Sequence, residues 1–453
     1  MHSETESHNS IFGITWNSVL ALMIVLLVLI GVALFLVFTA QPAQGQTYRV
    51  IYNFTGGEDG GNPEAGLTID ESGNLYGTIV AGGPAGAVFE LERTNSGWRE
   101  RTLYQFRDQP DGASPAGRVI FGPDGSLYGV TEEGGISVPL YCNGGCGTVF
   151  RLTRPATACT RGSCPWTETV LYRFAGSPDG ALPVAEVAFD QAGNMYGTTS
   201  NGGSGNNGYG NGTVYELSPS GGGWTESVLW TFSGGSDGYM PFAGVILDQY
   251  GNLYGTSYGG GDHRCFAGGG YGCGVVFELT PSYGGWAENV LYSFRGGSDG
   301  GYPAGGLISD QSGNLFGTTE GLGLYGGWRL GPGTGGSAFK LSLSNDGWSF
   351  SALHSFTMLP QLCWFGPAAG LAMDSAGRLY GTTACNGAYG LGNVFELIPS
   401  DGGWTYSSLH DFLGGNDAQH SYGNVVFDAN GNMYGTTSLG GSYDYGTVWE
   451  ITP

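Results

Sequence analysis

One ten-residue pattern constrains the fold of this chain more than any other feature, because it recurs along nearly the whole length. The pattern, Asp-x-x-Gly-Asn-Leu-Tyr-Gly-Thr-Thr, occurs seven times with small changes among 453 residues. A motif that returns at a spacing of several tens of residues indicates an architecture in which one structural unit is used several times. The aromatic position of the pattern recurs every 52 to 68 residues, at Tyr76, Tyr128, Tyr196, Tyr254, Phe316, Tyr380 and Tyr434.

Each repeat predicts four short β-strands, which we name a, b, c and d. In the first repeat these are residues 66–70, 75–80, 87–92 and 98–106, rich in Val, Leu, Tyr and Phe and separated by Gly, Asn, Asp and Ser. The a–b turn begins with Asp70 and ends with Gly73-Asn74, residue types that favour a tight hairpin. Four-stranded repeats are typical of propeller blades. We therefore predict an all-β, seven-bladed β-propeller over residues 47–453.

The two ends of this region complete one blade. The last repeat stops after its strand c, at residues 447–451, and residues 48–54 have the pattern of a strand d without a preceding a, b and c. We expect the N-terminal strand to complete the seventh blade, which closes the ring and leaves no exposed sheet edge.

The repeat resembles a known family. The run Gly-Asn-Leu-Tyr-Gly-Thr-Thr, then Gly-Gly, then Gly-Thr-Val-Phe-Glu-Leu is similar to the GloVer-type tandem repeat of bacterial choice-of-anchor surface proteins, over about residues 47–453. The resemblance implies a secreted or anchored propeller. It supplies no ligand, reaction or catalytic residue.

Composition and charge limit the partners. The chain has 88 Gly, 13% aromatic residues and 12% charged residues, so it carries enough apolar side chains for a large core. Its formal net charge is −23, with Lys340 as the single Lys. An acidic surface repels phosphate backbones, so we expect no nucleic-acid partner.

An apolar segment precedes the propeller. No Asp, Glu, Lys or Arg lies between Glu6 and Arg49, and residues 19–40 are almost entirely apolar. A helix of that length would span roughly 33 Å, enough to cross a bilayer core. We predict a short tail at 1–15, a transmembrane signal-anchor helix at 16–40 and a linker at 41–46. Because the family's anchor type varies and the last repeat ends the sequence, this helix is the expected anchor. The alternative is cleavage near Gly45, which would release the protein.

Eight cysteines predict four local disulfides. Strand order places the d–a and b–c connections on one face of the ring and the a–b and c–d turns on the other. A bridge between the faces would exceed the Cα separation that a disulfide permits. The pairs expected are Cys142–Cys146, Cys159–Cys164, Cys265–Cys273 and Cys363–Cys385. Such bridges indicate an oxidising compartment, with the propeller outside the cytoplasm. The alternative for Cys142 and Cys146 is a zinc site, although no His or second pair completes it.

The b–c loops vary most in length, which indicates a working face. We name the face formed by the d–a and b–c connections the variable face. Its aromatics could pack beneath Gly-rich loops, or they could bind the apolar faces of sugars in a polysaccharide. The aromatics expected in contact with ligand are Trp328, Trp364, Tyr209, Tyr258, Tyr271, Tyr325, Tyr389 and Tyr443, with Tyr141, Phe266 and Tyr445 as further members.

A recurrent carboxylate lies on the same face. Each d–a loop except that of blade six carries an Asp at an equivalent position, and these side chains either close their own turns or bind Ca²⁺ as a ring. Turn closure is the simpler interpretation, so no cofactor is required. The residues are Asp59, Asp111, Asp179, Asp237, Asp299 and Asp417.

Catalysis at a single site would need residues that are not shared by all repeats. The candidates for acid–base hydrolysis of a glycan are few, and no nucleophile elbow, phosphate loop or metal motif accompanies them. We therefore expect a surface binding or adhesion module for a glycan or surface protein, with an envelope structural protein and a carbohydrate-active hydrolase or lyase as alternatives. The catalytic candidates are Glu132, Glu133, Asp262, His263 and Glu320.

Overall fold

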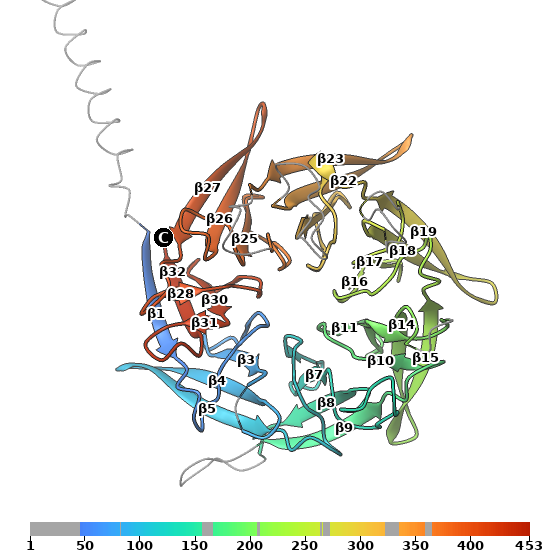
Figure 1. Ribbon diagram of the computed structural model, residues 1–453, viewed down its shortest axis with the longest axis horizontal. Helices are drawn as coiled ribbons and strands as arrows, with labels where there is room; N and C mark the ends of the chain where they lie inside the picture. Colours follow the sequence, from blue (N-terminus) through green and yellow to red (C-terminus); the bar gives the residue numbers. More distant parts are fainter. Residues whose placement is uncertain are drawn as a thin grey trace, which may run out of the picture. The chain divides into compact units, whose positions relative to one another are not determined.

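The computed structural model describes residues 46–81, 83–155, 166–205, 209–262, 265, 272–321, 335–357 and 365–453. Within these ranges the unit Tyr48–Thr452 contains seven four-stranded antiparallel sheets. The sheets follow one another around a central channel as the blades of a propeller (Figure 1). The predicted transmembrane helix at 16–40 lies outside the described residues. Within the described ranges, no helix is long and apolar enough to cross a membrane.

Each blade has the predicted strand order, with strand a nearest the channel and strand d outermost (Figure 1). The a strands are β2 (Thr68–Ile69), β6 (Ile120–Phe121), β11 (Ala188–Phe189), β16 (Ile246–Leu247), β20 (Ile308–Ser309), β24 (Ala372–Met373) and β29 (Val426–Phe427). The b strands are β3 (Leu75–Ile79), β7 (Leu127–Thr131), β12 (Met195–Thr199), β17 (Leu253–Ser257), β21 (Leu315–Thr319), β25 (Leu379–Thr383) and β30 (Met433–Thr437).

The outer half of each blade is a long hairpin. The c strands are β4 (Ala87–Thr94), β8 (Thr148–Thr153), β14 (Thr213–Ser220), β18 (Val275–Ser282), β22 (Ser337–Ser344), β26 (Asn393–Ser400) and β32 (Thr447–Thr452). The d strands are β5 (Gly97–Gln105), β9 (Thr167–Arg173), β15 (Gly223–Thr231), β19 (Gly285–Ser293), β23 (Gly347–Ser355), β27 (Gly403–Asp411) and β1 (Thr47–Asn53).

Short elements connect the loops of the variable face. Two-stranded sheets join d–a to b–c segments in blades three and seven, and a 3-10 turn, η2 (Gly297–Asp299), lies in one d–a loop. The sheets pair β10 (Gly180–Ala181) with β13 (Asn201–Gly202), and β28 (Ala418–Gln419) with β31 (Leu439–Gly440). This direct pairing places the d–a and b–c connections on one face, as expected.

The predicted a–b turn forms for the expected reason. The Asp70 carboxylate accepts hydrogen bonds from the backbone N–H groups of Ser72 and Asn74, both at 2.9 Å. Gly73 has φ of +81°, a conformation that Gly adopts without a steric penalty. Strand a is shorter than the predicted 66–70: Asp70 belongs to the turn, and only Thr68–Ile69 pair with strand b.

The hydrophobic core lies between blades. Seven clusters of buried side chains each combine residues of two adjacent blades, such as Tyr76 and Phe106 of blade one with Phe150 of blade two. A Trp at the start of strand d in six blades packs against the strand-b aromatic ring of the preceding blade. The pairs are Trp98–Tyr434, Trp166–Tyr76, Trp224–Tyr128, Trp286–Tyr196, Trp348–Tyr254 and Trp404–Phe316.

The residue two positions after that Trp in strand d differs between blades, and it gives two kinds of contact between neighbouring blades. Blades one to four carry Glu100, Glu168, Glu226 and Glu288, each electrostatically coupled to the Asp of the d–a loop that leads from the preceding blade into its own blade. Blades five to seven carry aromatic rings that stack on the strand-d ring of the preceding blade. These stacks are Phe350–Tyr292, Tyr406–His354 and Tyr48–His410.

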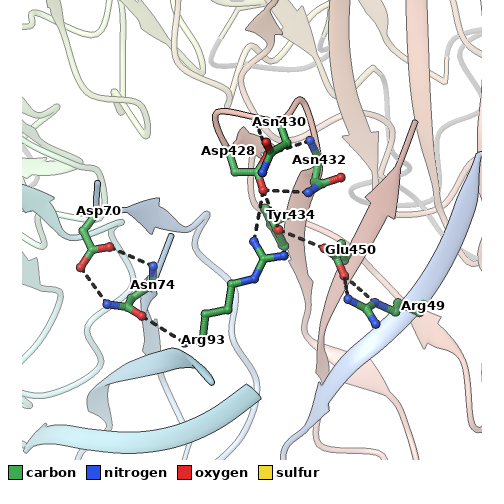
Figure 2. Close-up of polar contacts among 9 residues, drawn as sticks. All are labelled: Arg49, Asp70, Asn74, Arg93, Asp428, Asn430, Asn432, Tyr434 and Glu450. Atoms are coloured by element: carbon green, nitrogen blue, oxygen red, sulfur yellow. Dashed lines mark hydrogen bonds and ion pairs between the residues drawn. The ribbon is translucent and has the colours of Figure 1, made fainter. Parts of the chain in front are cut away.

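The predicted ring closure is confirmed, since β1 pairs with β32 as the fourth strand of blade seven. Figure 2 shows the polar contacts around this junction. Arg49 on β1 forms an ion pair with the buried Glu450 on β32. Across the next blade contact, Arg93 Nη1 of blade one lies 3.5 Å from Asp428 Oδ2 of blade seven. The two ends of the propeller are therefore joined by a complete sheet and by charged side chains.

Candidate functional site

The backbone at the mouth of the channel follows one plan on the variable face. In six blades, the residue at one equivalent d–a position has left-handed φ between 52° and 60°. Its carbonyl accepts a hydrogen bond from the residue that follows strand b, as in Glu320 N–H to Tyr302 O at 3.1 Å and Tyr258 N–H to Met240 O at 3.0 Å. Because the backbone is fixed by these bonds, the side chains at these positions are free to differ between blades.

All seven blades line the channel with the residues that lead into strand a. Most of them are Ala or Gly, which leaves a cavity of about 260 Å³. At the mouth the larger side chains are Glu64, Val184, Phe242 and Tyr422. Deeper in the channel, Arg118 Nη2 lies 3.5 Å from Glu186 Oε1. That Glu186 oxygen is 3.8 Å from the position a Cβ on Gly306 would take, so this ion pair reaches toward blade five.

Three aromatic rings and one buried acid form a connected group at the mouth. Tyr258 contacts Phe242 and Tyr302 with ring centroids 5.1 and 5.0 Å apart. The Tyr258 hydroxyl donates to Glu320 Oε2 at 3.3 Å. Glu320 is only 9% exposed. A carboxyl this deeply buried is costly to ionise without a counter-ion.

Electrostatic coupling extends this group around the mouth. Burial raises the pKa of Glu320 to about 7, although the hydrogen bond from Tyr258 acts in the opposite direction. Burial, then the carboxylates of Glu64 and Glu320, raise the pKa of Tyr422 to about 12. Burial, then Glu133 and Glu64, also raise the pKa of Glu132. We name Glu64, Glu132, Phe242, Tyr258, Tyr302, Glu320 and Tyr422 the mouth cluster.

Three residues predicted from the sequence belong to this cluster, namely Glu132, Glu320 and Tyr258. Glu133 is exposed beside Glu132. Asp262 lies in the b–c loop of blade four, where its carbonyl accepts a hydrogen bond from Cys273 N–H at 3.1 Å. The fifth catalytic candidate, His263, lies outside the described residues.

Four members were not predicted: Glu64, Phe242, Tyr302 and Tyr422. In the d–a loops of most blades a Pro follows four residues after the repeated Asp, and these four residues lie directly before or after that position. From the sequence alone they look like ordinary loop residues. The available signal was variation at one register. The residue that follows the proline position is Glu, Ala, Val, Phe, Ala, Ala and Tyr in blades one to seven, respectively.

The remaining predicted aromatics are spread over the variable face. Tyr209 is 47% exposed, and its ring meets that of Tyr141 from the neighbouring blade at 5.3 Å. Tyr389 and Tyr443 are 53% and 57% exposed. Tyr445 instead packs over Gly56 and Gly61, as the alternative interpretation expected. The other candidates, Trp328, Trp364, Tyr271, Tyr325 and Phe266, lie outside the described residues.

The recurrent d–a carboxylates close their own turns. Asp59 Oδ2 accepts hydrogen bonds from Thr55 N–H at 3.0 Å and from the Tyr52 hydroxyl at 2.9 Å. Equivalent bonds to the backbone N–H four residues earlier are made by Asp111, Asp179, Asp237, Asp299 and Asp417. Within the described ranges, no group of three or more His, Cys, Asp or Glu side chains is arranged to hold a metal ion.

Two of the predicted disulfides are formed, Cys142–Cys146 and Cys265–Cys273. Cys385 is also disulfide-bonded. Its predicted partner Cys363, and the pair Cys159–Cys164, lie outside the described residues. Disulfides are typical of proteins outside the cytoplasm.

Fold and site together define a tandem-repeat β-propeller whose repeat-breaking side chains gather at one mouth of the central channel. The chain belongs to the Gloeobacter/Verrucomicrobia repeat family, whose model matches residues 36–267, 143–358 and 265–453. This match confirms the resemblance drawn from the repeat motif. No curated protein sequence matches the chain.

Solved structures share the fold at low identity. The chain is 12% identical to an ulvan lyase solved with a bound GlcA–Rha3S saccharide, with a TM-score of 0.50 and coverage of 86% of this chain and 92% of that chain. It is 13% identical to the extracellular domain of a proposed hybrid two-component system from B. thetaiotaomicron, with a TM-score of 0.47. That match covers 90% of this chain and 41% of the other, so this chain spans less than half of its length.

Proposed function

We propose that this protein is an extracytoplasmic binding module, held at the membrane by residues 16–40, whose variable face binds a glycan or another surface polymer. The observation that carries the proposal is the mouth cluster. Its rings and acids sit where the repeat allows side chains to differ, beside a cavity of about 260 Å³. Concave sites that combine aromatic faces with a few convergent polar groups are typical of ligand binding.

Aromatic rings supply the affinity in this proposal. Tyr258 and Tyr302 are partly exposed at the mouth, so a sugar ring can stack on them. Tyr209, Tyr389 and Tyr443 extend the apolar surface toward the rim of the same face. The loop tryptophans Trp328 and Trp364 stay part of the proposed surface, on the sequence argument alone.

The test is a glycan-array screen with the full-length protein in detergent, followed by titration of the best ligand. Tyr258→Ala with Tyr302→Ala should weaken binding about tenfold, because each stacked ring supplies roughly 0.5–1.5 kcal/mol. The matched control is Tyr283→Ala, since Tyr283 is fully exposed on the c–d hairpin of blade four, on the opposite face. An unchanged affinity in the double variant, with its melting temperature preserved, would remove the mouth from the proposal.

A carbohydrate-active hydrolase is the second candidate function. It is favoured by one observation, the raised pKa of Glu320, which lets this carboxyl hold a proton near neutral pH as a general acid must. Product release from a bound glycan, abolished by Glu320→Gln with binding retained, would establish hydrolysis. Absence of turnover for every ligand bound on the array would leave binding as the function.

A further inference from the structure

The mouth cluster has negative groups without positive partners. Among the described residues, Glu64, Glu132 and Glu320 form no ion pair with Lys, Arg or His. The Arg that lines the channel, Arg118, is already paired with Glu186. Several other buried carboxylates do have such partners, namely Glu450 with Arg49, Glu90 with Arg101, Asp299 with Arg295 and Glu396 with Arg378.

Glu320 shows the imbalance most clearly. Its side chain is 9% exposed, and its described side-chain partner is one phenol, at 3.3 Å. A buried carboxyl in this position either keeps its proton or receives a cation from outside. Tyr258 then has two roles, because it orients the carboxyl and presents its ring face beside it.

The surrounding rings match the same chemistry. A cation is attracted to the faces of aromatic rings, most strongly where water is excluded. Tyr258 contacts the rings of Phe242 and Tyr302, and its hydroxyl donates to the Glu320 carboxyl, so three connected rings lie next to that acid. An ammonium group offers three donors to carboxylate and phenol oxygens, whereas a sugar without charge leaves the buried carboxyl uncompensated.

We propose that the ligand carries a primary ammonium group and that the mouth cluster binds it. The ammonium donates to Glu320, with Glu64 and Glu132 at the opposite side of the mouth, and lies against the ring of Tyr258. This inference rests on the proposed function and narrows its ligand to an amino-bearing glycan, whose pyranose ring stacks on the remaining aromatic faces. The net charge of −23 draws such a polycation to the protein.

The experiment compares two oligosaccharides that differ in one group. Full-length protein in detergent is titrated with a fully deacetylated glucosamine hexamer and with the N-acetylglucosamine hexamer. The amine form should bind at least tenfold more tightly, and its affinity should fall as salt is raised from 50 to 500 mM. Glu320→Gln should remove most of that difference while leaving the weaker N-acetyl binding in place. The control is Glu71→Gln, an exposed carboxylate in the a–b turn of blade one on the opposite face.

Each other outcome decides the matter. Equal affinity for the two hexamers overturns the ammonium inference and leaves glycan binding standing. Tight binding of neutral or acidic glycans, with no binding of the amine form, also overturns it. If neither hexamer binds and the array is empty, the proposed function fails as well. If poly-lysine binds as tightly as the amine glycan, and Glu320→Gln weakens both, the ligand is a basic peptide and the glycan assignment is wrong.

Discussion

At one strand-c position of each blade, a large ring packs against the Gly in the middle of strand b. A Cβ on Gly77 would approach the ring of Phe89 to 2.6 Å, which explains why the repeat keeps Gly there. Five blades have Phe at this position, and Tyr215 and Trp449 replace it in blades three and seven. The Tyr215 hydroxyl and the Trp449 Nε1 are buried without a hydrogen-bond partner among the described residues.

We predict that Tyr215→Phe stabilises the protein. Tyr215 is fully buried, and removing an unsatisfied hydroxyl should raise the free energy of unfolding by about 1 kcal/mol. The comparison is Tyr76→Phe, which removes a hydroxyl whose oxygen lies 3.0 Å from Asp70 Oδ2 and 2.8 Å from Glu90 Oε1, within hydrogen-bond distance of both carboxylates. That change should lower the free energy of unfolding by about 1–2 kcal/mol. Denaturant titration measures both, and a destabilised Tyr215→Phe would contradict the argument.

The sequence predicted individual residues where they interrupt a repeat and missed them where no repeat was visible. Glu132, Glu320 and Tyr258 follow the strongly repeated strand b, so their departure from the pattern was evident. Glu64 and Tyr422 occupy a register that holds Glu, Val, Phe, Tyr or Ala in different blades, so no repeat is visible there. Only the ring brings these positions together, because they come from blades far apart in sequence.

Contacts between neighbouring blades are of two chemical kinds, acidic or aromatic, depending on the residue at one position of strand d. At four contacts a Glu faces the Asp of the d–a loop that enters its own blade. In three of them the strand-d Tyr of the preceding blade is also close. Burial is the main reason that the pKa of Glu100, Glu168, Glu226 and Glu288 is raised to about 7. For Glu168, Arg173 opposes this shift. At the other three contacts the rings stack and carry no such acid.

These four acids should make the protein less stable as pH rises. Their pKa in the folded state is about 7, against an ordinary value of 4.5, so the folded protein binds more protons between those values. Their contribution is therefore full below pH 4.5 and is lost as pH rises through 7. Partial solvent access screens the repulsion, so we expect a melting temperature a few degrees lower at pH 8 than at pH 5.

The variant that tests this replaces all four Glu residues with Gln. Its melting temperature should depend less on pH than that of the parent. A control with Glu58→Gln, Glu71→Gln, Asp346→Asn and Asp401→Asn removes the same charge from exposed positions. Hydrogen exchange should locate the effect, with protection factors that fall between pH 5 and pH 8 in β5, β9, β15 and β19 and change little in β23 and β27. Uniform exchange around the ring would contradict the assignment.

More of the structure could be predicted from the sequence at the scale of the whole propeller than at the scale of single residues or strands. Repeat number, strand order and the shared seventh blade followed from counting strands, and the structure has all three. The central cavity could not be predicted in the same way. Its wall takes a few residues from each of seven distant segments, and its volume depends on side chains that meet only after closure.

Closure itself can be tested by deletion. Removing residues 47–54 deletes β1, which exposes the backbone edge of β32 and leaves the buried Glu450 without Arg49. Exposed edges pair with other chains, so the variant should aggregate or form oligomers. Deleting residues 2–9, a segment of equal length, serves as the control. Sedimentation velocity distinguishes them, and a monomeric variant that melts like the parent would show that β1 is dispensable.

The pairing of β1 with β32 also has a consequence for the order in which the strands of the propeller pair during folding. Arg49 and Glu450 are 401 positions apart in the chain, so the first strand of the propeller waits for the last before it has a partner. Contacts between residues this distant form late, because the loop that joins them carries the largest entropic cost. During synthesis we therefore expect β1 to stay unpaired until the six blades that follow it in the chain have assembled. A chain interrupted before residue 447 would keep that strand free, and the ring would have no way to complete itself.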